Sequence, residues 1–542
     1  MPAISDYKSY KKFEPEYADW KYKRELADAK RIKYLEENPD KIDQEDVQRG
    51  KALLRAIDTM DEFSQQRAEN TEVATESIIS LLFELTMFAG GALGVLATRM
   101  KPFQNYIAKH FPKTNNTSLY TVAMLIGGGI ASSLAGFPLF SWGAKKEVEA
   151  SQKGRFEAMR EDLNDAKLFA VLSPEQEIEL EERIKDIKVP KEKKHKGLSE
   201  SITTVKELVS SSKVYKAQKK EFEERLNEDL NHFDDKLSED EIEKAKKDKM
   251  LLTNLVEKID IASQDYAENV ELATSTLTTS VFAFGALFTL AFNKLVTKLK
   301  INNMWSKVPA VLGFAAMIGA SIFSASIQKQ ASRVGRFKIK QELSQNPANF
   351  AYADENNING IPDFEITKNK KDNIFVFLKK AWKNNKEFEK WEKSDGLKEK
   401  ATAIALKEME FTENQIKDAK RLQHNTFKTF NKVDSNSQKY SEAIEALGQG
   451  IQNPISILFT TIGAMIGVKR LNKALLTNGA DKFKGVMEYI VIILLSTLPS
   501  VLINAYITKE QKKASRVASM LTIKELDDYR NFADYSGKPK LN

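Results

Sequence analysis

The chain has 542 residues, with 83 Lys and Arg against 76 Asp and Glu and a formal net charge of +7. A surplus this small, spread over this length, argues against a dedicated nucleic-acid-binding protein. The sequence contains no cysteine, which excludes disulfides, thiolate metal sites and cysteine nucleophiles.

The apolar residues gather into six blocks, although 29% of the chain is charged. Each block is about 18–25 residues long, the length that an α-helix needs to cross roughly 30 Å of hydrocarbon. The blocks are Ile78–Thr98, Leu119–Gly143, Leu272–Phe292, Val308–Ile327, Ile451–Val468 and Gly485–Ile507. Six such blocks in so polar a chain predict six transmembrane helices.

Two short strings recur beside these blocks. The odd-numbered blocks follow MDEFSQQRAENTEVAT from Met60, IDIASQDYAENVELAT from Ile259 and VDSNSQKYSEAIEALG from Val433. The even-numbered blocks precede EASQKGRFEAM, QASRVGRFKIK and KASRVASMLTI. The same order three times indicates internal repetition. We predict an all-α membrane protein of three tandem helical-hairpin repeats, with long charged extramembrane helices of the coiled-coil type.

The repeats divide the chain into three segments. Residues 1–172 hold an N-terminal segment and repeat one, residues 173–348 hold repeat two, and residues 349–542 hold a linker and repeat three. Candidate helix caps are Asp43, Ser173, Ser238 and Thr412. Because no Pro or Gly lies between Ser238 and Val281, that helix is expected to run unbroken from solvent into the membrane.

The first recurring string places an acidic face before each odd-numbered block. Within one copy these residues, together with Ser64, fall within an arc of roughly 140° on a helix, so they mark one side of it. The acidic face consists of Asp61, Gln65, Glu69 and Glu72, then Asp260, Gln264, Glu268 and Glu271, then Asp434, Gln438, Glu442 and Glu445.

The second string places basic residues on each returning helix. They are Lys153, Arg155, Arg333, Arg336 and Arg516. Two interpretations follow. The acidic and basic residues pair within each hairpin, or the three copies surround a pseudo-threefold axis and stack carboxylates as a cation-attracting ring.

The returning helices also repeat a small residue at every fourth position. Gly154, Gly335 and Ala518 are the second members of these pairs. Small residues at this spacing allow close approach of helix backbones. The pattern predicts packing inside the chain or, alternatively, an interface between copies.

Two further features suggest ligands. Glu84 lies well inside the first apolar block, and an intramembrane carboxylate suggests an ion or proton pathway or a hydrogen bond to a neighbouring helix. The loop from Asp354 resembles EF-hand calcium loops, with Glu355, Asn357, Asn359 and Asp363 as oxygen ligands around Gly360. It departs from that pattern at both ends, where Glu355 replaces the first Asp and Ile366 replaces the bidentate acid.

The sequence carries no phosphate-binding, nucleophile-elbow or histidine metal motif, so we expect a non-enzymatic protein without a cofactor, calcium excepted. Since most of the chain is charged helix outside the blocks, the expected function is a membrane scaffold. Its extramembrane helices would contact a partner, another copy or lipid. The alternative is a pseudo-threefold ion channel or transporter with an acidic vestibule.

The expected location is a cell membrane, with multiple spans. The hairpin tips carry thirteen Lys and Arg against one acid, Asp481, which favours cytoplasmic tips. The absence of an apolar signal sequence before the first block favours cytoplasmic termini instead. We expect the termini to be cytoplasmic.

Overall fold

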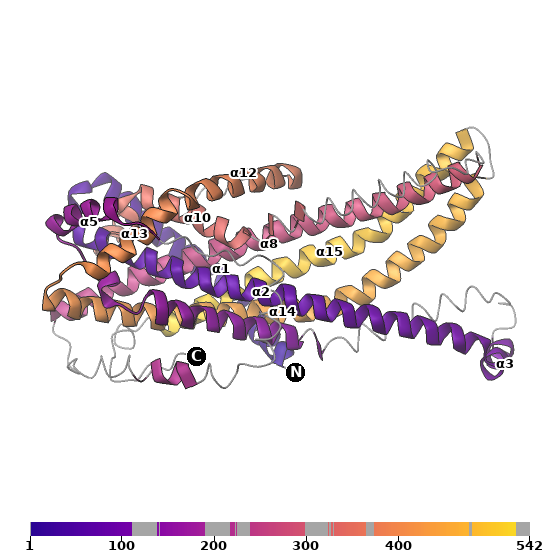
Figure 1. The fold of residues 1–542 in the computed structure, drawn as a ribbon, viewed down its shortest axis with the longest axis horizontal. Helices are drawn as coiled ribbons and strands as arrows, with labels where there is room; N and C mark the ends of the chain where they lie inside the picture. The colour runs from indigo at the N-terminus through magenta and orange to yellow at the C-terminus, as the bar shows by residue number, and fades with distance from the viewer. Residues whose placement is uncertain are drawn as a thin grey trace.

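The computed structural model is all-α over the residues it describes, which are 2–110, 138–139, 141–189, 217–222, 224, 239–298, 323–324, 327–328, 330–364, 373–475 and 480–526. No strand occurs in these ranges. The helices form a thick body at one end, from which the longest helices project to the other end (Figure 1).

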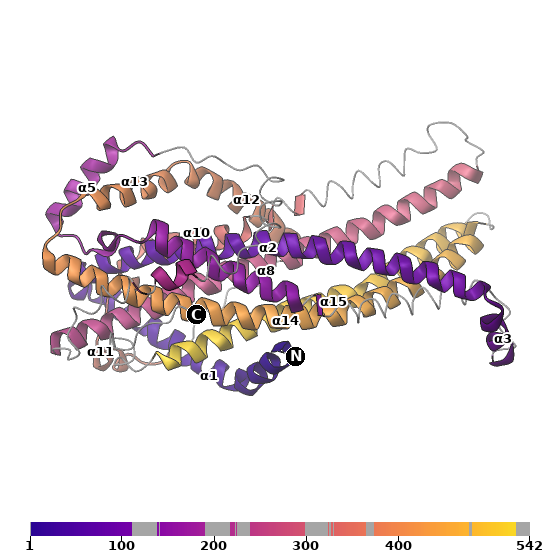
Figure 2. The same ribbon diagram turned by 60° about the horizontal axis from the view of Figure 1, so that its bottom comes forward.

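Four long helices dominate the architecture. They are α2 (Gln44–Arg99), α8 (Glu239–Lys298), α14 (Glu413–Leu475) and α15 (Ala480–Glu525). At 1.5 Å per residue, α14 with its 63 residues is roughly 95 Å long. Helices α14 and α15 lie side by side in antiparallel fashion (Figures 1 and 2).

The local signals that start these helices act as expected. Asp43 accepts a hydrogen bond from the backbone N–H of Glu45 at 2.9 Å, and α2 begins at Gln44. Thr412 and Gln415 form a reciprocal capping box at the start of α14. The expectation of an unbroken helix after Ser238 is confirmed from Glu239 onward, while Ser238 itself lies outside the described residues.

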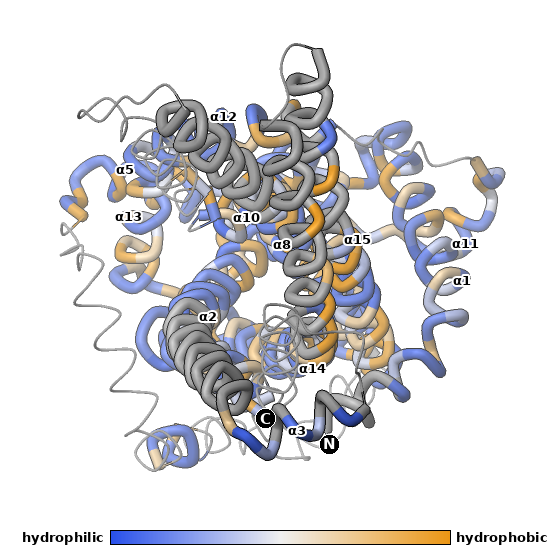
Figure 3. Tube along the Cα trace, turned by 90° about the vertical axis from the view of Figure 1, so that its right-hand side faces the viewer, coloured by the Kyte–Doolittle hydropathy of each residue, from blue (hydrophilic) through white to orange (hydrophobic). Residues whose placement is uncertain are grey.

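Shorter helices surround the long ones. They are α1 (Pro2–Glu37), α3 (Lys101–His110), α5 (Pro174–Asp186), α10 (Ala331–Gln345), α11 (Glu355–Asn359), α12 (Ile374–Glu392) and α13 (Asp395–Glu408). A capping box between Ser173 and Gln176 begins α5, as the sequence predicts. Along the long axis, α1 and α11 lie on one side of α8, α14 and α15, and α5, α12 and α13 lie on another (Figure 3).

One hydrophobic core joins all three sequence segments. It contains buried residues from α2, α8, α13 and α14, so the segments do not build separate cores. On the three long incoming helices, α2, α8 and α14, fully buried positions recur at spacings of four and three, which is typical of coiled-coil packing. These positions are Leu53, Ile57, Met60 and Ser64; Leu252, Val256, Ile259 and Ser263; and Thr426, Phe430, Val433 and Ser437.

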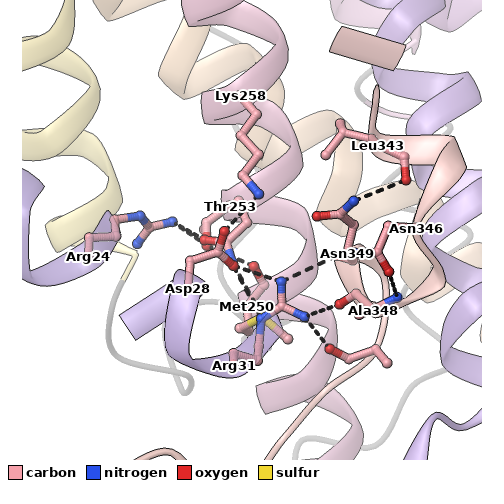
Figure 4. Close-up of polar contacts among 12 residues, drawn as sticks. Arg24, Asp28, Arg31, Met250, Thr253, Lys258, Leu343, Asn346, Ala348 and Asn349 are labelled. Atoms are coloured by element: carbon pink, nitrogen blue, oxygen red, sulfur yellow. Dashed lines mark hydrogen bonds and ion pairs between the residues drawn. The ribbon is translucent and has the colours of Figure 1, made fainter. Parts of the chain in front are cut away.

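Helix α1 is fixed to this core by polar contacts. Arg31 is 3% exposed and donates to the backbone carbonyls of Ala348 and Ala351 (Figure 4). Asp28 forms an ion pair with Lys258 of α8 at 2.7 Å. Burial alone would raise the pKa of Asp28, but the nearby charges of Arg31 and Lys258 hold that pKa at about 2. The N-terminal segment is therefore an integral part of the body.

Within the described residues, no helix combines the length and the apolar character needed to cross a membrane. The blocks Leu119–Gly143 and Val308–Ile327 lie largely outside those residues. The other four blocks lie on helical backbone of α2, α8, α14 and α15, but most of their side chains, that of Glu84 included, are outside the description.

The buried coiled-coil positions yield a stability prediction. Ile57→Ala should lower the free energy of unfolding by about 2–5 kcal/mol, because it opens a cavity at a position that is 0% exposed. Lys51→Ala, an exposed change on the same helix, should stay within about 0.5 kcal/mol of the wild type. Denaturant unfolding followed by circular dichroism measures both. An equal loss of unfolding free energy in the two variants would contradict the burial of Ile57 in the core.

Candidate functional site

Three aspartates, one from each copy of the first string, meet in the interior of the body. Asp61 of α2, Asp260 of α8 and Asp434 of α14 are each 0% exposed, and one carboxylate oxygen from each lies within 4.8 Å of the other two. We call these residues, with the serine three positions and the glutamine four positions after each aspartate, the aspartate layer. Among the described residues, this is the group of three or more acidic or histidine side chains that has metal-binding spacing.

The layer has three corners, and at each one the aspartate of one helix lies beside the serine of a neighbouring helix. Two of these corners have the same set of hydrogen bonds. The Ser64 hydroxyl of α2 donates to Asp434 at 2.8 Å, and Gln438 donates to both of these groups, at 3.1 and 3.2 Å. The Ser437 hydroxyl of α14 donates to Asp260 at 3.0 Å, and Gln264 donates to both, at 2.9 and 2.8 Å. Each of these two serines thus bonds the aspartate of a neighbouring helix, which links α2 to α14 and α14 to α8.

The third corner, formed by Asp61, Ser263 and Gln65, has the same residue types but lacks these hydrogen bonds. Ser263 lies against Asp61 and lowers its pKa, yet the Ser263 hydroxyl, the Asp61 Oδ1 atom and the Gln65 Nε2 atom are all buried without a hydrogen-bond partner. Buried polar atoms are bonded in the great majority of cases, so three such atoms at one corner are unusual.

Two arginines neutralise part of the layer. Arg155 pairs with Asp434, and Arg336 of α10 pairs with Asp61 at 3.1 Å. Both guanidinium groups are nearly inaccessible, so these are buried ion pairs, in which the loss of one partner leaves an isolated charge. The position of the third copy that matches Arg155 and Arg336 is Ser519, which bonds its own helix backbone.

Asp260 differs from the other two aspartates, because it forms no ion pair in the described part of the chain. Burial, and then the negative charges of Asp434 and Asp61, raise the pKa of Asp260 well above its ordinary value. Burial also raises the pKa of Asp61 to about 7 despite the opposing charge of Arg336. The layer thus favours extra positive charge at neutral pH.

These contacts correct the prediction that acidic and basic residues pair within each hairpin. Arg155 belongs to the first copy but pairs with Asp434 of the third, and Arg336 of the second copy pairs with Asp61 of the first. Arg516 pairs with Asp265 rather than with the layer. Within the first hairpin, Arg67 of the incoming helix pairs with Glu157 of the returning helix at 2.8 Å, so the charges are reversed from the predicted arrangement.

The physical reason lies in the small residues of the returning helices. A Cβ on Gly154 would be 2.1 Å from the Phe63 carbonyl oxygen, and one on Gly335 would be 2.5 Å from the Ala262 carbonyl oxygen. The small residue therefore lies against the incoming helix of its own hairpin. The next residue, Arg155 or Arg336, points about 100° further round the helix and reaches the neighbouring incoming helix.

The remaining acidic-face residues lie around the layer. Glu69 accepts a hydrogen bond from Ser332, and burial raises its pKa to about 7. Glu268 lies 3.8 Å from Lys512, and Glu445 accepts from Gln511 at 2.9 Å. Glu271, Glu442 and Lys153 are partly buried. Arg333 forms ion pairs with Glu62 and Glu392. The Glu72 side chain lies outside the described residues.

The calcium-binding loop stays a prediction. Glu355, Asn357 and Asn359 lie in the short helix α11, which Asp354 caps through the backbone N–H of Asn356. Asp363 forms an ion pair with Lys30 of α1 at 2.5 Å. The Glu355 side chain is outside the description.

A second charged junction was not predicted from the sequence. Arg49 of α2 is 2% exposed and lies 3.2 Å from Asp248 of α8 and 2.9 Å from Asp418 of α14. It joins the same three helices roughly 18 Å from the aspartate layer, since 12 residues separate Arg49 from Asp61. No local sequence pattern marks this junction, because its residues come from three separate helices.

No known protein family, curated protein or solved structure shows significant similarity to the chain. A function can therefore be inferred only from the chemistry of its own residues.

The buried pair between Arg155 and Asp434 yields a prediction that separates pairing from simple packing. Arg155→Met should lower the free energy of unfolding by about 3–5 kcal/mol, because Asp434 is left buried without its counter-charge. The double variant Arg155→Met with Asp434→Asn should recover most of this loss. A double-mutant cycle by denaturant unfolding measures the coupling, and purely additive effects would contradict it.

The glycine contact yields another prediction. Gly154→Ala should lower the free energy of unfolding by about 1–3 kcal/mol, since the new Cβ would meet the fixed backbone of Phe63. The control is Gly360→Ala, where the nearest atom is 3.7 Å away and little change is expected. Thermal unfolding of both variants provides the measurement, and a neutral Gly154→Ala would disprove the close approach.

Proposed function

We propose that the chain is a non-enzymatic integral membrane scaffold of three tandem helical-hairpin repeats. In this proposal the six apolar blocks are transmembrane helices, and the body around the aspartate layer projects on the cytoplasmic side with both termini. The body contacts lipid and a protein partner or a second copy of the chain.

The continuity of the long helices carries this proposal. Helices α2, α8 and α14 each pass without interruption from the aspartate layer into an apolar block, those beginning at Ile78, Leu272 and Ile451. The Gly448 and Pro454 positions, where the sequence allows kinks, also lie within continuous helix. Because the aspartate layer joins the three helices, a displacement of the body is transmitted along them to the three apolar blocks. Such an arrangement suits a protein that holds a partner at a defined distance from a bilayer.

Exposed apolar side chains support contact with lipid. On α14, Ile451, Phe459 and Ile466 are 58%, 43% and 49% exposed, and spacings of eight and seven residues place them on one face. On α15, Leu502 and Tyr506 are 60% and 57% exposed and lie one turn apart. Exposed apolar surface of this extent indicates a binding surface, and the apolar blocks to which these residues belong suit hydrocarbon.

The geometry of the layer favours a scaffold over a channel. A cation-attracting vestibule needs carboxylates that face water. The aspartates of the layer are fully buried, and two of them are paired with arginine. The observed arrangement instead holds helices together, and cation flux through liposomes containing the purified chain would overturn the scaffold proposal.

The missing cysteines allow a direct test of membrane insertion and orientation. Single cysteines replace two exposed residues, Asn105 in α3 near the hairpin tip and Lys246 in α8 within the body. In intact cells, a membrane-impermeant maleimide should label Asn105→Cys. Lys246→Cys should react only after permeabilisation, because the body is cytoplasmic.

Carbonate extraction of the same membranes is the companion measurement. The chain should stay in the pellet, as integral proteins do. Release into the supernatant would overturn membrane insertion. Labelling of Lys246→Cys alone in intact cells would reverse the orientation and leave the scaffold proposal intact.

A further inference from the structure

The aspartate layer carries one negative charge more than its arginines neutralise. Three carboxylates face two guanidinium groups, those of Arg155 and Arg336. Around the layer, Asp58 lies 2.7 Å from Lys340 and also 3.3 Å from Arg336, so Arg336 is shared between Asp58 and Asp61. Glu62 pairs with Arg333, and Arg516 pairs with Asp265. Glu268 faces Lys512, whereas Glu69 accepts a hydrogen bond from the neutral Ser332 and has the charges of Arg336 and Arg333 nearby. A single positive charge would complete the layer.

The oxygen atoms of the layer have a spacing that suits a metal cation. Oxygens on opposite sides of a cation with bonds of about 2.3–2.6 Å, as for Ca²⁺, lie about 4.6–5.2 Å apart. Sodium is close to calcium in size. One carboxylate oxygen from each aspartate lies within 4.8 Å of the others, so one ion of this size can contact all three.

The third corner provides an independent indication of a ligand. The Ser263 hydroxyl is 0% exposed and near enough to Asp61 to lower its pKa, but the contact does not have the geometry of a hydrogen bond. The Oδ1 atom of Asp61 is also buried and unpartnered. At the other two corners the equivalent serine hydroxyl donates to an aspartate, whereas at this corner neither oxygen has a hydrogen bond.

We propose that the aspartate layer binds one monovalent metal cation of the size of Na⁺, held by Asp61, Asp260 and Asp434 and by the Ser263 hydroxyl. The charge balance selects a monovalent ion, because a divalent ion would leave the buried layer with a net positive charge. The bound cation joins α2, α8 and α14 inside the body. The site does not depend on the membrane orientation or on any flux through the chain.

A proton is the natural competitor for this site. Protonation of one carboxylate would neutralise the same negative charge, so protons compete with the cation as the pH falls. At alkaline pH the buried carboxylates are ionised and repel one another, which lowers the stability of the folded state. A cation should restore the lost stability at alkaline pH.

The test compares thermal unfolding of the full purified chain in detergent, in NaCl and in N-methyl-D-glucamine chloride at equal ionic strength. At pH about 8.5, Na⁺ should raise the unfolding midpoint by at least about 3 °C, and at pH about 6 the difference should shrink. Equal midpoints in the two salts at alkaline pH would overturn the proposal. A response to Ca²⁺ without one to Na⁺ would do the same, because it contradicts the charge balance.

Two variants remove the surplus charge in opposite ways. Asp260→Asn keeps the shape of the side chain and mimics the protonated acid, so the Na⁺-dependent shift should disappear. Ser519→Arg introduces a guanidinium group at the position that matches Arg155 and Arg336, and it should abolish the shift while all three carboxylates remain. Because the two changes are unrelated, loss of folding in one leaves the other as the test.

Asp248→Asn is the matched control. Asp248 is on the same helix, buried, and next to Arg49, but it lies in the other charged junction. This variant should keep the full Na⁺-dependent shift. A shift that persists in Asp260→Asn, or that vanishes in Asp248→Asn, would place the cation elsewhere and overturn the proposal.

Discussion

Burial of three carboxylates at one level of the bundle is the constraint on which the rest of this structure depends. An ionised carboxylate loses much of its hydration when it is fully buried, so it needs hydrogen bonds and counter-charges from its neighbours. Here those groups come from other helices. The Ser64 hydroxyl of α2 donates a hydrogen bond to Asp434 of α14, and Arg336 of α10 forms an ion pair with Asp61 of α2. The polar layer therefore specifies which helices are neighbours, whereas the apolar layers beside it supply most of the favourable burial.

The layer also explains the small residues and the arginines of the returning helices. A returning helix must approach its own incoming helix closely enough for its arginine to reach past it, and Gly154 and Gly335 permit this approach. In the third copy, Ala518 and Ser519 occupy the corresponding positions, and no arginine reaches Asp260 from there. Departure from symmetry at this one corner gives the layer its unbalanced charge, and with it the capacity for a cation or a proton.

This layer links the proposed scaffold role to the proposed cation site. A body that transmits displacement to membrane helices needs those helices to be joined rigidly inside it, and buried polar contacts with few alternatives can join them. Stability that depends on a monovalent ion would make the rigidity of this junction sensitive to the ionic environment. The second junction around Arg49 differs in that it contains a further cationic group, Lys244, which lies 2.9 Å from Asp418.

The sequence by itself determined the helical class, several helix starts and the residues that matter most. Caps at Asp43, Ser173 and Thr412 depend on local hydrogen bonds, and the recurring aspartates are visible in the strings, so both could be predicted. Only the tertiary structure decided that these aspartates are buried together and that Arg155 pairs with Asp434 rather than with Asp61. The reason is that sequence periodicity specifies the face on which a residue lies, whereas the partner of that face depends on how separate helices pack. Long-range contacts such as those of Arg31 and Arg49 leave no local pattern at all.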